Sequence, residues 1–205
     1  MRYRLSYADV AAWLAERGIS VDPSTVSDWV RVFTPRFIAV ARAHRSRVSQ
    51  RWRVDETYIK IAKRWHYLVR AIDEHGHILA VYLSDRRDCA AAHAFFEAAM
   101  GTTMVPPSRV TTDTATCSPR ALRTVLPQVE HRSSKYLHNG LERDHQQLKG
   151  RIRLMRWFKT TGGASNFCQG HALIRTVRGG CSSRTVTVPL RLRLATAWSA
   201  RAARL

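Results

Sequence analysis

The sequence predicts an α/β fold, a mixed five-stranded sheet flanked by helices, with a small helical unit in front of it. Three observations predict this fold. Two compact helical patterns occupy residues 5–33, three strand-like segments follow with no helix between them, and strands then alternate with helices from residue 88 onward. The chain has 205 residues, of which 45% are hydrophobic, which is enough for one buried core and an accessory unit.

The N-terminal unit carries helix start and stop signals. Ser6 with Asp9 resembles a capping box, Gly18 provides a stop, and Asp22 can cap a second helix that begins at Pro23. Two short helices joined by a tight turn indicate a helix-turn-helix in residues 1–34, and an ordinary helical hairpin is the alternative. The exposed face of the second helix offers groups suited to a DNA groove: Ser24, Thr25, Ser27 and Arg31.

A basic connector is expected next. Residues 29–54 contain no acid and seven arginines. We expect residues 35–52 to connect the two units, passing from helix into loop near Pro35. The connector either contacts phosphates or is a solvated linker.

The core begins with three strands. The segments WRVDETYIKI, WHYLVRAID and ILAVYLSD are rich in β-branched and aromatic residues, and their short connections indicate an antiparallel meander. After them we expect a helix at 88–100, a strand RVTTD, a helix at 119–126, a strand QVEHRSSKY, and helices at 139–154 and 165–178. This βββαβαβα order is that of the ribonuclease-H-like fold, which we assign to residues 53–180.

The charge balance indicates a polyanionic partner. There are 34 Lys and Arg against 15 Asp and Glu, a net charge of +19, and nucleic acid is favoured over the alternative of a generally basic soluble protein. No apolar run approaches the roughly 20 residues of a membrane span, and no secretory signal is visible. We therefore expect no membrane partner. The four cysteines have no zinc-site spacing, so we expect free thiols and a cytoplasmic location.

Three carboxylates could form a metal centre for cutting phosphodiesters. Asp55 lies inside the first strand, Asp113 ends the fourth, and Glu142 lies near the start of a helix. Two divalent ions about 3.5–4 Å apart can activate an oxygen nucleophile and neutralise developing charge. An acid in a core strand is costly unless it is paired or binds a cation. Each residue also has a plainer interpretation: Asp113 as a turn or cap residue, and Glu142 as a favourable first-turn acid.

A second basic segment follows these carboxylates. Residues 145–205 contain no acid and twelve Lys or Arg. We expect a DNA track there, although a solvated face is the usual interpretation of a charge run. Its candidate DNA contacts are Lys149, Arg151, Arg153, Arg156 and Lys159. Residues 181–205 form a basic tail of uncertain order.

The sequence also resembles a known family. Its motifs W-R-V-D-E-T-Y-I-K, W-H-Y-L-V-R-A-I-D, Y-L-S-D-R-R, T-T-D-T-A and H-N-G-L-E-R-D-H-Q-Q-L-K are similar to those of DDE transposases of the bacterial insertion-sequence-six family. The likeness covers roughly residues 5–180 and extends to the expected helix-turn-helix.

The resemblance implies a ribonuclease-H-like DNA transposase that cleaves and transfers DNA strands. It implies two Mg²⁺ ions, with Mn²⁺ as a substitute, held by Asp55 in V-D-E-T-Y, Asp113 in T-D-x-A and Glu142 in N-x-x-E-x-D-H. The expected partners are double-stranded DNA at the element ends and at the target, and further copies of the chain in a homodimer or larger assembly. The expected location is the bacterial cytoplasm, in association with the nucleoid.

The chain departs from the family pattern at several positions. Only 28 residues separate Asp113 from Glu142 (142 − 113 − 1), Thr116 and Ser118 replace the usual Pro and Tyr, and Trp157 replaces a glycine. The alternative function is therefore a degraded, catalytically inactive copy that acts only as a DNA-binding protein.

Overall fold

The computed structural model describes residues 5–43, 48–103, 105–112, 118–134, 139–155, 157–180 and 187–202. Five strands form one sheet in the order β3-β2-β1-β4-β5. The first three strands are antiparallel to one another, and β4 and β5 run parallel to β1. Their bounds are β1 Arg51–Ile61, β2 Arg64–Asp73, β3 Ile78–Ser84, β4 Arg109–Thr112 and β5 Glu130–Ser133.

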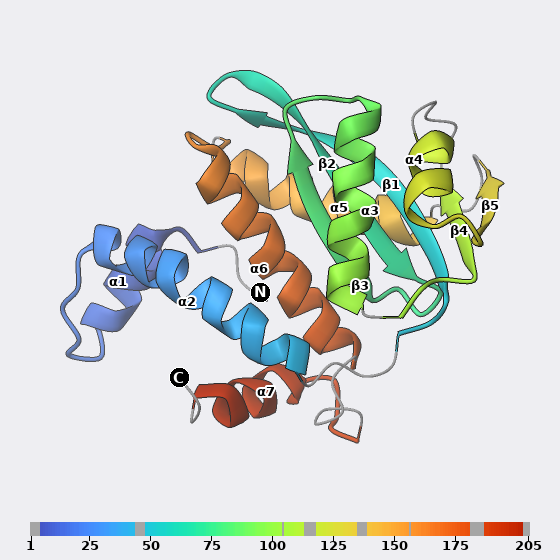
Figure 1. Cartoon of the computed structure of the whole chain (residues 1–205). Coiled ribbons are helices and arrows are strands. Elements are labelled where there is room, and N and C mark those ends of the chain that lie inside the picture. Colours follow the sequence, from blue (N-terminus) through green and yellow to red (C-terminus); the bar gives the residue numbers. More distant parts are fainter. Residues whose placement is uncertain are drawn as a thin grey trace.

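Helices cover both faces of this sheet (Figure 1). The order along the chain confirms the βββαβαβα pattern, and with the mixed sheet it confirms the ribonuclease-H-like core. The helix bounds are α1 Tyr7–Ala15, α2 Pro23–Ala43, α3 Cys89–Thr103, α4 Ser118–Val125, α5 Asn139–Leu154, α6 Thr161–Gly179 and α7 Arg193–Ala202.

The alternation of β1 divides the core into two layers. Trp52 and Val54 face α3 and α4, where Phe95, Phe96 and Leu122 are almost fully buried. The opposite face packs against α5 and α6 through Ile59, Ile61, Leu148, Ile152 and Cys168. Since successive strand residues point to opposite faces, Asp55 belongs to the α5–α6 side and Glu56 to the α3–α4 side.

The N-terminal helices follow their sequence signals, with one exception. The predicted capping box is present, since the Ser6 side chain accepts from the backbone of Asp9 and the Asp9 side chain accepts from the backbone of Ser6. Gly18 has a φ of 77° after α1. The predicted passage from helix into loop near Pro35 is wrong, because α2 continues through Pro35 to Ala43.

Tertiary contacts along α2 explain why the helix continues. A proline inside a helix costs about 3 kcal/mol or more. The Asn166 side chain on α6 donates to the Val30 carbonyl at 3.1 Å, and the ring of Phe37 lies 4.4 Å from that of Trp198 on α7. These contacts hold α2 along α6 and α7, as Figure 1 also shows.

Part of the tail of uncertain order has a defined structure. Helix α7 buries Ala197 to 2% exposure. The Arg193 side chain donates to the backbone carbonyls of Arg178 and Val188, which holds the start of α7 at the end of α6. Residues 181–186 and 203–205 of the tail lie outside the described residues.

Trp157 has a left-handed backbone, with φ at 70°. The next residue, Phe158, forms a bridge with Ile61 at the end of β1, and its carbonyl accepts from Ala62 at 2.9 Å. The chain therefore turns sharply between α5 and this bridge. Because glycine adopts such a backbone without strain, the geometry explains why the resembled motif carries glycine at this position.

Candidate active site

Asp55 lies on β1 beneath helix α5. Its side chain is 17% exposed, and its Oδ2 lies 3.5 Å from Nδ1 of His145. Its Oδ1 accepts a hydrogen bond of 2.7 Å from the backbone N–H of Glu56. The carboxylate is thus held at the sheet surface with limited access to solvent.

The parallel pairing of β1 and β4 brings a second predicted segment to the same point. Thr112, the last residue of β4, pairs with Val54, the residue before Asp55. Thr112 is 2% exposed, and its hydroxyl lies 2.9 Å from Nε2 of His131 on β5. Burial, with the nearby charge of Arg123, lowers the pKa of His131. Asp113 itself lies outside the described residues.

Helix α5 brings a third segment to Asp55. His145 is 7% exposed and faces Asp55 from this helix. Glu142 belongs to α5, three residues before His145, but its side chain lies outside the described residues. The structure therefore brings Asp55 and His145 together, and the convergence of the three predicted carboxylates stays a prediction.

The sequence analysis missed Arg70 on β2. In the antiparallel register Arg70 is the partner of Asp55, so the two side chains lie on the same face of the sheet. Arg70 is only 1% exposed. A charged residue between Val69 and Ala71, in the apolar second half of the strand, was the available signal, and it is the same signal that singled out Asp55.

Arg70 also acts on a buried thiol of α6. Burial raises the pKa of Cys168 to about 12, while the positive charge of Arg70 opposes that rise. Cys168 is 1% exposed, and Cys89, the first residue of α3, is partly buried. Cys117 and Cys181 lie outside the described residues.

Glu56 does not join the Asp55 site. Its carboxylate pairs with Nε of Arg87 at 2.9 Å, and its side chain is 19% exposed. Burial raises the pKa of Glu56, Arg87 lowers it, and Asp55 adds a smaller upward effect. Glu56 and Arg87 therefore form a structural ion pair on the opposite face of the sheet.

The residues predicted to read DNA lie on α2. Ser24 and Arg31 are exposed, whereas Thr25 and Ser27 are partly buried. Arg31 forms an ion pair of 2.9 Å with Asp28, and both side chains are largely exposed. Exposed pairs of this kind are weak, so Arg31 can exchange Asp28 for another anion at little cost.

The predicted DNA track follows the end of α5 and the turn after it. Lys149 and Arg151 are partly buried, and Arg153 and Lys159 are exposed. Arg156 lies outside the described residues.

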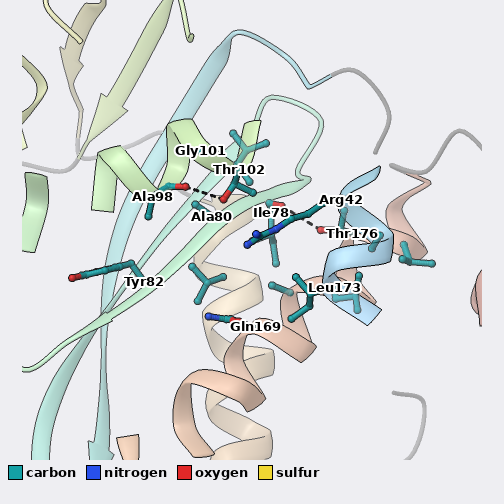
Figure 2. A pocket seen from close by; sticks show the side chains of 16 residues that line it. Arg42, Ile78, Ala80, Tyr82, Ala98, Gly101, Thr102, Gln169, Leu173 and Thr176 are labelled. Carbon is teal, nitrogen blue, oxygen red and sulfur yellow. Dashed lines mark hydrogen bonds between the residues drawn. The ribbon is translucent and has the colours of Figure 1, made fainter. Parts of the chain in front are cut away.

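An apolar pocket of about 480 Å³ lies between β3, α3, α6 and the end of α2 (Figure 2). Tyr82, Ala98 and Leu173 line it, together with the polar groups of Arg42 and Gln169. The described residues that line it include no carboxylate and no histidine, so they offer nothing to the chemistry of Asp55.

Within the described part of the chain, no group of three His, Cys, Asp or Glu side chains could hold a metal ion. Asp113 and the Glu142 side chain are not among the described residues. Over the same described ranges, no helix is long and apolar enough to span a membrane.

Comparison with known proteins adds independent findings. The family model DDE_Tnp_IS240, described as a DDE domain, matches residues 49–180. The transposase for insertion sequence-like element IS431mec of Staphylococcus aureus is 38% identical over 156 residues, which cover 74% of this chain and 69% of the relative. The transposase for IS257 in transposon Tn4003 of Staphylococcus aureus has the same identity and coverage.

Two solved integrase domains are also similar to the chain. The HTLV-2 integrase catalytic core domain in complex with magnesium matches with a TM-score of 0.43 and 15% identity, covering 76% of this chain and 87% of that one. The catalytic core domain of BIV integrase matches with a TM-score of 0.42 and 15% identity, covering 62% of this chain and 82% of that one.

Proposed function

The chain belongs to the DDE transposases of bacterial insertion elements, in the insertion-sequence-six family, and we propose that Asp55, Asp113 and Glu142 are its catalytic, metal-binding carboxylates. One observation carries this assignment. The strand that leads into Asp113 ends beside Asp55, because Thr112 pairs with Val54.

Helix α5 supports the third member of the set. His145 contacts Asp55, and Glu142 precedes His145 by three residues, which is about one turn on the same side of a helix. The helix that carries Glu142 therefore packs where the two strand segments meet.

The donor set suits Mg²⁺, because hard divalent cations prefer carboxylate oxygens. The contacts of Asp55 fit this role, since one oxygen is held by a backbone N–H and the other faces α5. When bound, two Mg²⁺ ions would supply charge neutralisation and activation of the attacking oxygen, with Mn²⁺ as a substitute.

The protein side chains orient and balance this centre. His145 and the Glu56 backbone N–H hold the Asp55 carboxylate in one orientation. Arg70 places a buried positive charge on the same face and offsets part of the negative charge of the carboxylates. The burial of Leu148 and Ile152 beneath α5 keeps that helix on the sheet.

The reaction is cleavage followed by strand transfer. A water oxygen attacks the phosphorus at the element end, the bond to the 3′ oxygen breaks, and that oxygen takes up a proton to become a 3′-hydroxyl. The hydroxyl then attacks a target phosphodiester, whose own 3′ oxygen leaves as a hydroxyl. No covalent protein–DNA intermediate is required.

DNA recognition is assigned to the remaining parts of the chain. Residues 1–34 form the proposed helix-turn-helix, residues 35–52 connect it to the core, residues 53–180 form the catalytic domain and residues 181–205 form a basic tail. The exposed side chains of Arg31 and Ser24 on α2, of Arg153 in the last turn of α5 and of Lys159 after it are consistent with contacts to duplex DNA. Because two element ends must be joined, the working form is a homodimer or a larger assembly, located in the cytoplasm with the nucleoid.

Strand transfer on DNA that carries the element ends tests this function. We expect cleaved and joined products with Mg²⁺ or Mn²⁺, and none when the metal is removed by a chelator. Binding without any product under all metal conditions would instead indicate the inactive, DNA-binding copy.

A further inference from the structure

A second, larger groove lies at the end of the sheet where β2 turns into β3. It has a volume of about 1030 Å³ and is open to solvent between this turn, α5, α6 and the segment that leads into α7. Gln147 contributes from α5, and Pro189, Leu190 and Leu194 form the apolar part of the wall. Its arginines belong to the acid-free segment 145–205, but the described residues that line it include none of the individual DNA contacts named from the sequence.

The groove is strongly basic. Arg175, Arg178 and Arg191 line it, together with His75 and His77, and none of the described residues that line it is an Asp or Glu. Arg175 and Arg178 are three residues apart on α6, so they lie on the same side of that helix. The absence of acids from residues 145–205 accounts for this imbalance.

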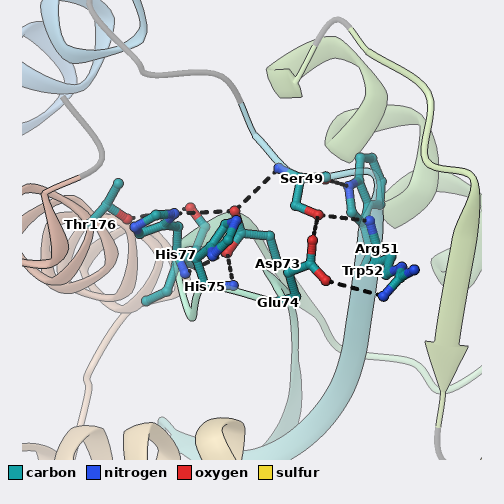
Figure 3. A network of polar contacts seen from close by, with 9 residues as sticks. Ser49, Arg51, Trp52, Asp73, Glu74, His75, His77 and Thr176 are labelled. Carbon is teal, nitrogen blue, oxygen red and sulfur yellow. Dashed lines mark hydrogen bonds and ion pairs between the residues drawn. The ribbon is translucent and has the colours of Figure 1, made fainter. Parts of the chain in front are cut away.

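The two acids at the end of β2 are engaged by neighbouring groups. Asp73 is fully buried and accepts hydrogen bonds from the backbone N–H groups of His75 and His77, and its Oδ2 lies 3.1 Å from Nδ1 of His77 (Figure 3). Glu74 accepts a hydrogen bond from the Ser49 hydroxyl and forms an ion pair with Arg51 at 3.6 Å. Both carboxylates are therefore bound by the β2–β3 turn and by the start of β1.

The wall that carries Arg191 is held in place by specific contacts. Arg193 donates to the carbonyls of Arg178 and Val188 at 3.1 and 2.9 Å. It crosses directly over Gly180, where a Cβ would lie 2.7 Å from the Arg193 guanidinium. Gly180 has a φ of 90°, which glycine adopts without strain, so its backbone both ends α6 and makes room for this clamp.

We propose that this basic groove, lined by Arg175, Arg178 and Arg191, binds the phosphate backbone of duplex DNA beside the catalytic centre. A guanidinium group can donate two parallel hydrogen bonds to the oxygens of one phosphate. The apolar wall and Gln147 leave room for the sugar edge. The groove deepens the proposed function, on which it rests, by adding a surface for the same DNA.

The position of the groove fits that role. Its histidines flank the end of β2, where Asp73 pairs with Trp52, three residues from Asp55 along β1. At the rise of a strand this is roughly 10 Å. On α5, Gln147 in the groove is two residues from His145 at the carboxylate site, so the two residues lie about 3 Å apart along the helix axis and point to different sides of it. A duplex held at the carboxylates can therefore reach the groove within a few base pairs.

The test compares two double variants in the full chain. R178Q/R191Q removes two arginines from the groove. R86Q/R120Q removes two exposed arginines that lie before α3 and on α4, over the other face of the sheet. Both changes lower the net charge by the same amount. Binding of a fluorescent element-end duplex is measured in EDTA over a range of salt concentrations, and thermal unfolding verifies that each variant is folded.

We expect R178Q/R191Q to weaken binding and to make the slope of log K against log salt less steep, by about 0.9 for each phosphate that the variant no longer neutralises. The control should keep the wild-type slope, and R178K/R191K should restore it. A wild-type slope in R178Q/R191Q overturns the proposal, as does an equal weakening in the control. Because this readout needs no cleavage, it remains decisive even if the proposed catalytic function fails, and that failure would appear separately as absent product with wild-type protein.

Discussion

Replacement of Asp55 by Asn tests the metal site most directly. The amide has nearly the size of the carboxylate and keeps an oxygen that can accept from the Glu56 backbone N–H, which is bonded at 2.7 Å in the wild type. What it loses is the negative charge that faces His145 at 3.5 Å and that would bind the cation.

The effects on stability and on rate should differ greatly in size. Since one hydrogen bond is kept and one ion pair is removed, D55N should lower the free energy of unfolding by no more than about 1–3 kcal/mol. Loss of an anionic metal ligand removes several kcal/mol of transition-state stabilisation. At about 1.4 kcal/mol for each tenfold change, cleavage should slow by at least about 10³-fold.

The assay combines binding and single-turnover cleavage of end-labelled DNA. D55N should bind in EDTA with wild-type affinity and give no detectable product with Mg²⁺. The matched control is D85N, which makes the same chemical change at an exposed residue after β3 and should cut normally. Cleavage by D55N at the wild-type rate would refute the assignment of Asp55.

Four further outcomes are expected. Arg31→Ala should weaken binding to element ends by about 1–3 kcal/mol if Arg31 reads a base, with cutting retained at saturating DNA; unchanged binding in a titration would exclude α2 as the recognition helix or Arg31 as its contact. Trp157→Gly should have a free energy of unfolding about 1 kcal/mol higher than Trp157→Ala in urea titrations, because both variants lose the ring but only glycine relieves the left-handed backbone; a more stable alanine variant would contradict the strain. Cys168, with its pKa raised to about 12, should resist iodoacetamide at pH 8 in the folded protein and react once urea unfolds the chain, as peptide mass mapping would reveal; rapid native labelling of Cys168 would argue against its burial. Burial acts to raise the pKa of Asp73, but its hydrogen bonds lower it by more, so its stabilisation is present above the unfolded pKa near 4 and is lost as pH falls through the lower folded pKa; Asp73→Asn should therefore cost about 1–3 kcal/mol at pH 7 and progressively less as the pH falls below about 4 in urea unfolding, and a cost that does not change with pH would count against this.

Local signals in the sequence were sufficient for the order of the elements from α1 to α6, whereas α7 was not predicted. The alternation of WRVDETYIKI predicts a strand, and the Ser6–Asp9 pair predicts a helix start, because each depends only on neighbours along the chain. The helix at residues 139–154 was predicted with the bounds that the structure has. An acid at position 55 inside such a strand also identified one member of the candidate site without any knowledge of its surroundings.

Contacts between distant segments decided the rest. Helix α2 continues through Pro35 because α6 and α7 pack along it, and no pattern within residues 23–43 contains that information. Arg70 becomes a neighbour of Asp55 only through the register of β1 and β2. The basic groove combines His75, Arg175 and Arg191, which are widely separated in the sequence and meet only when the β2–β3 turn, α6 and the start of α7 are packed together. Sequence patterns record what each segment prefers locally, whereas a surface or a charge pair depends on which segments the buried core brings into contact.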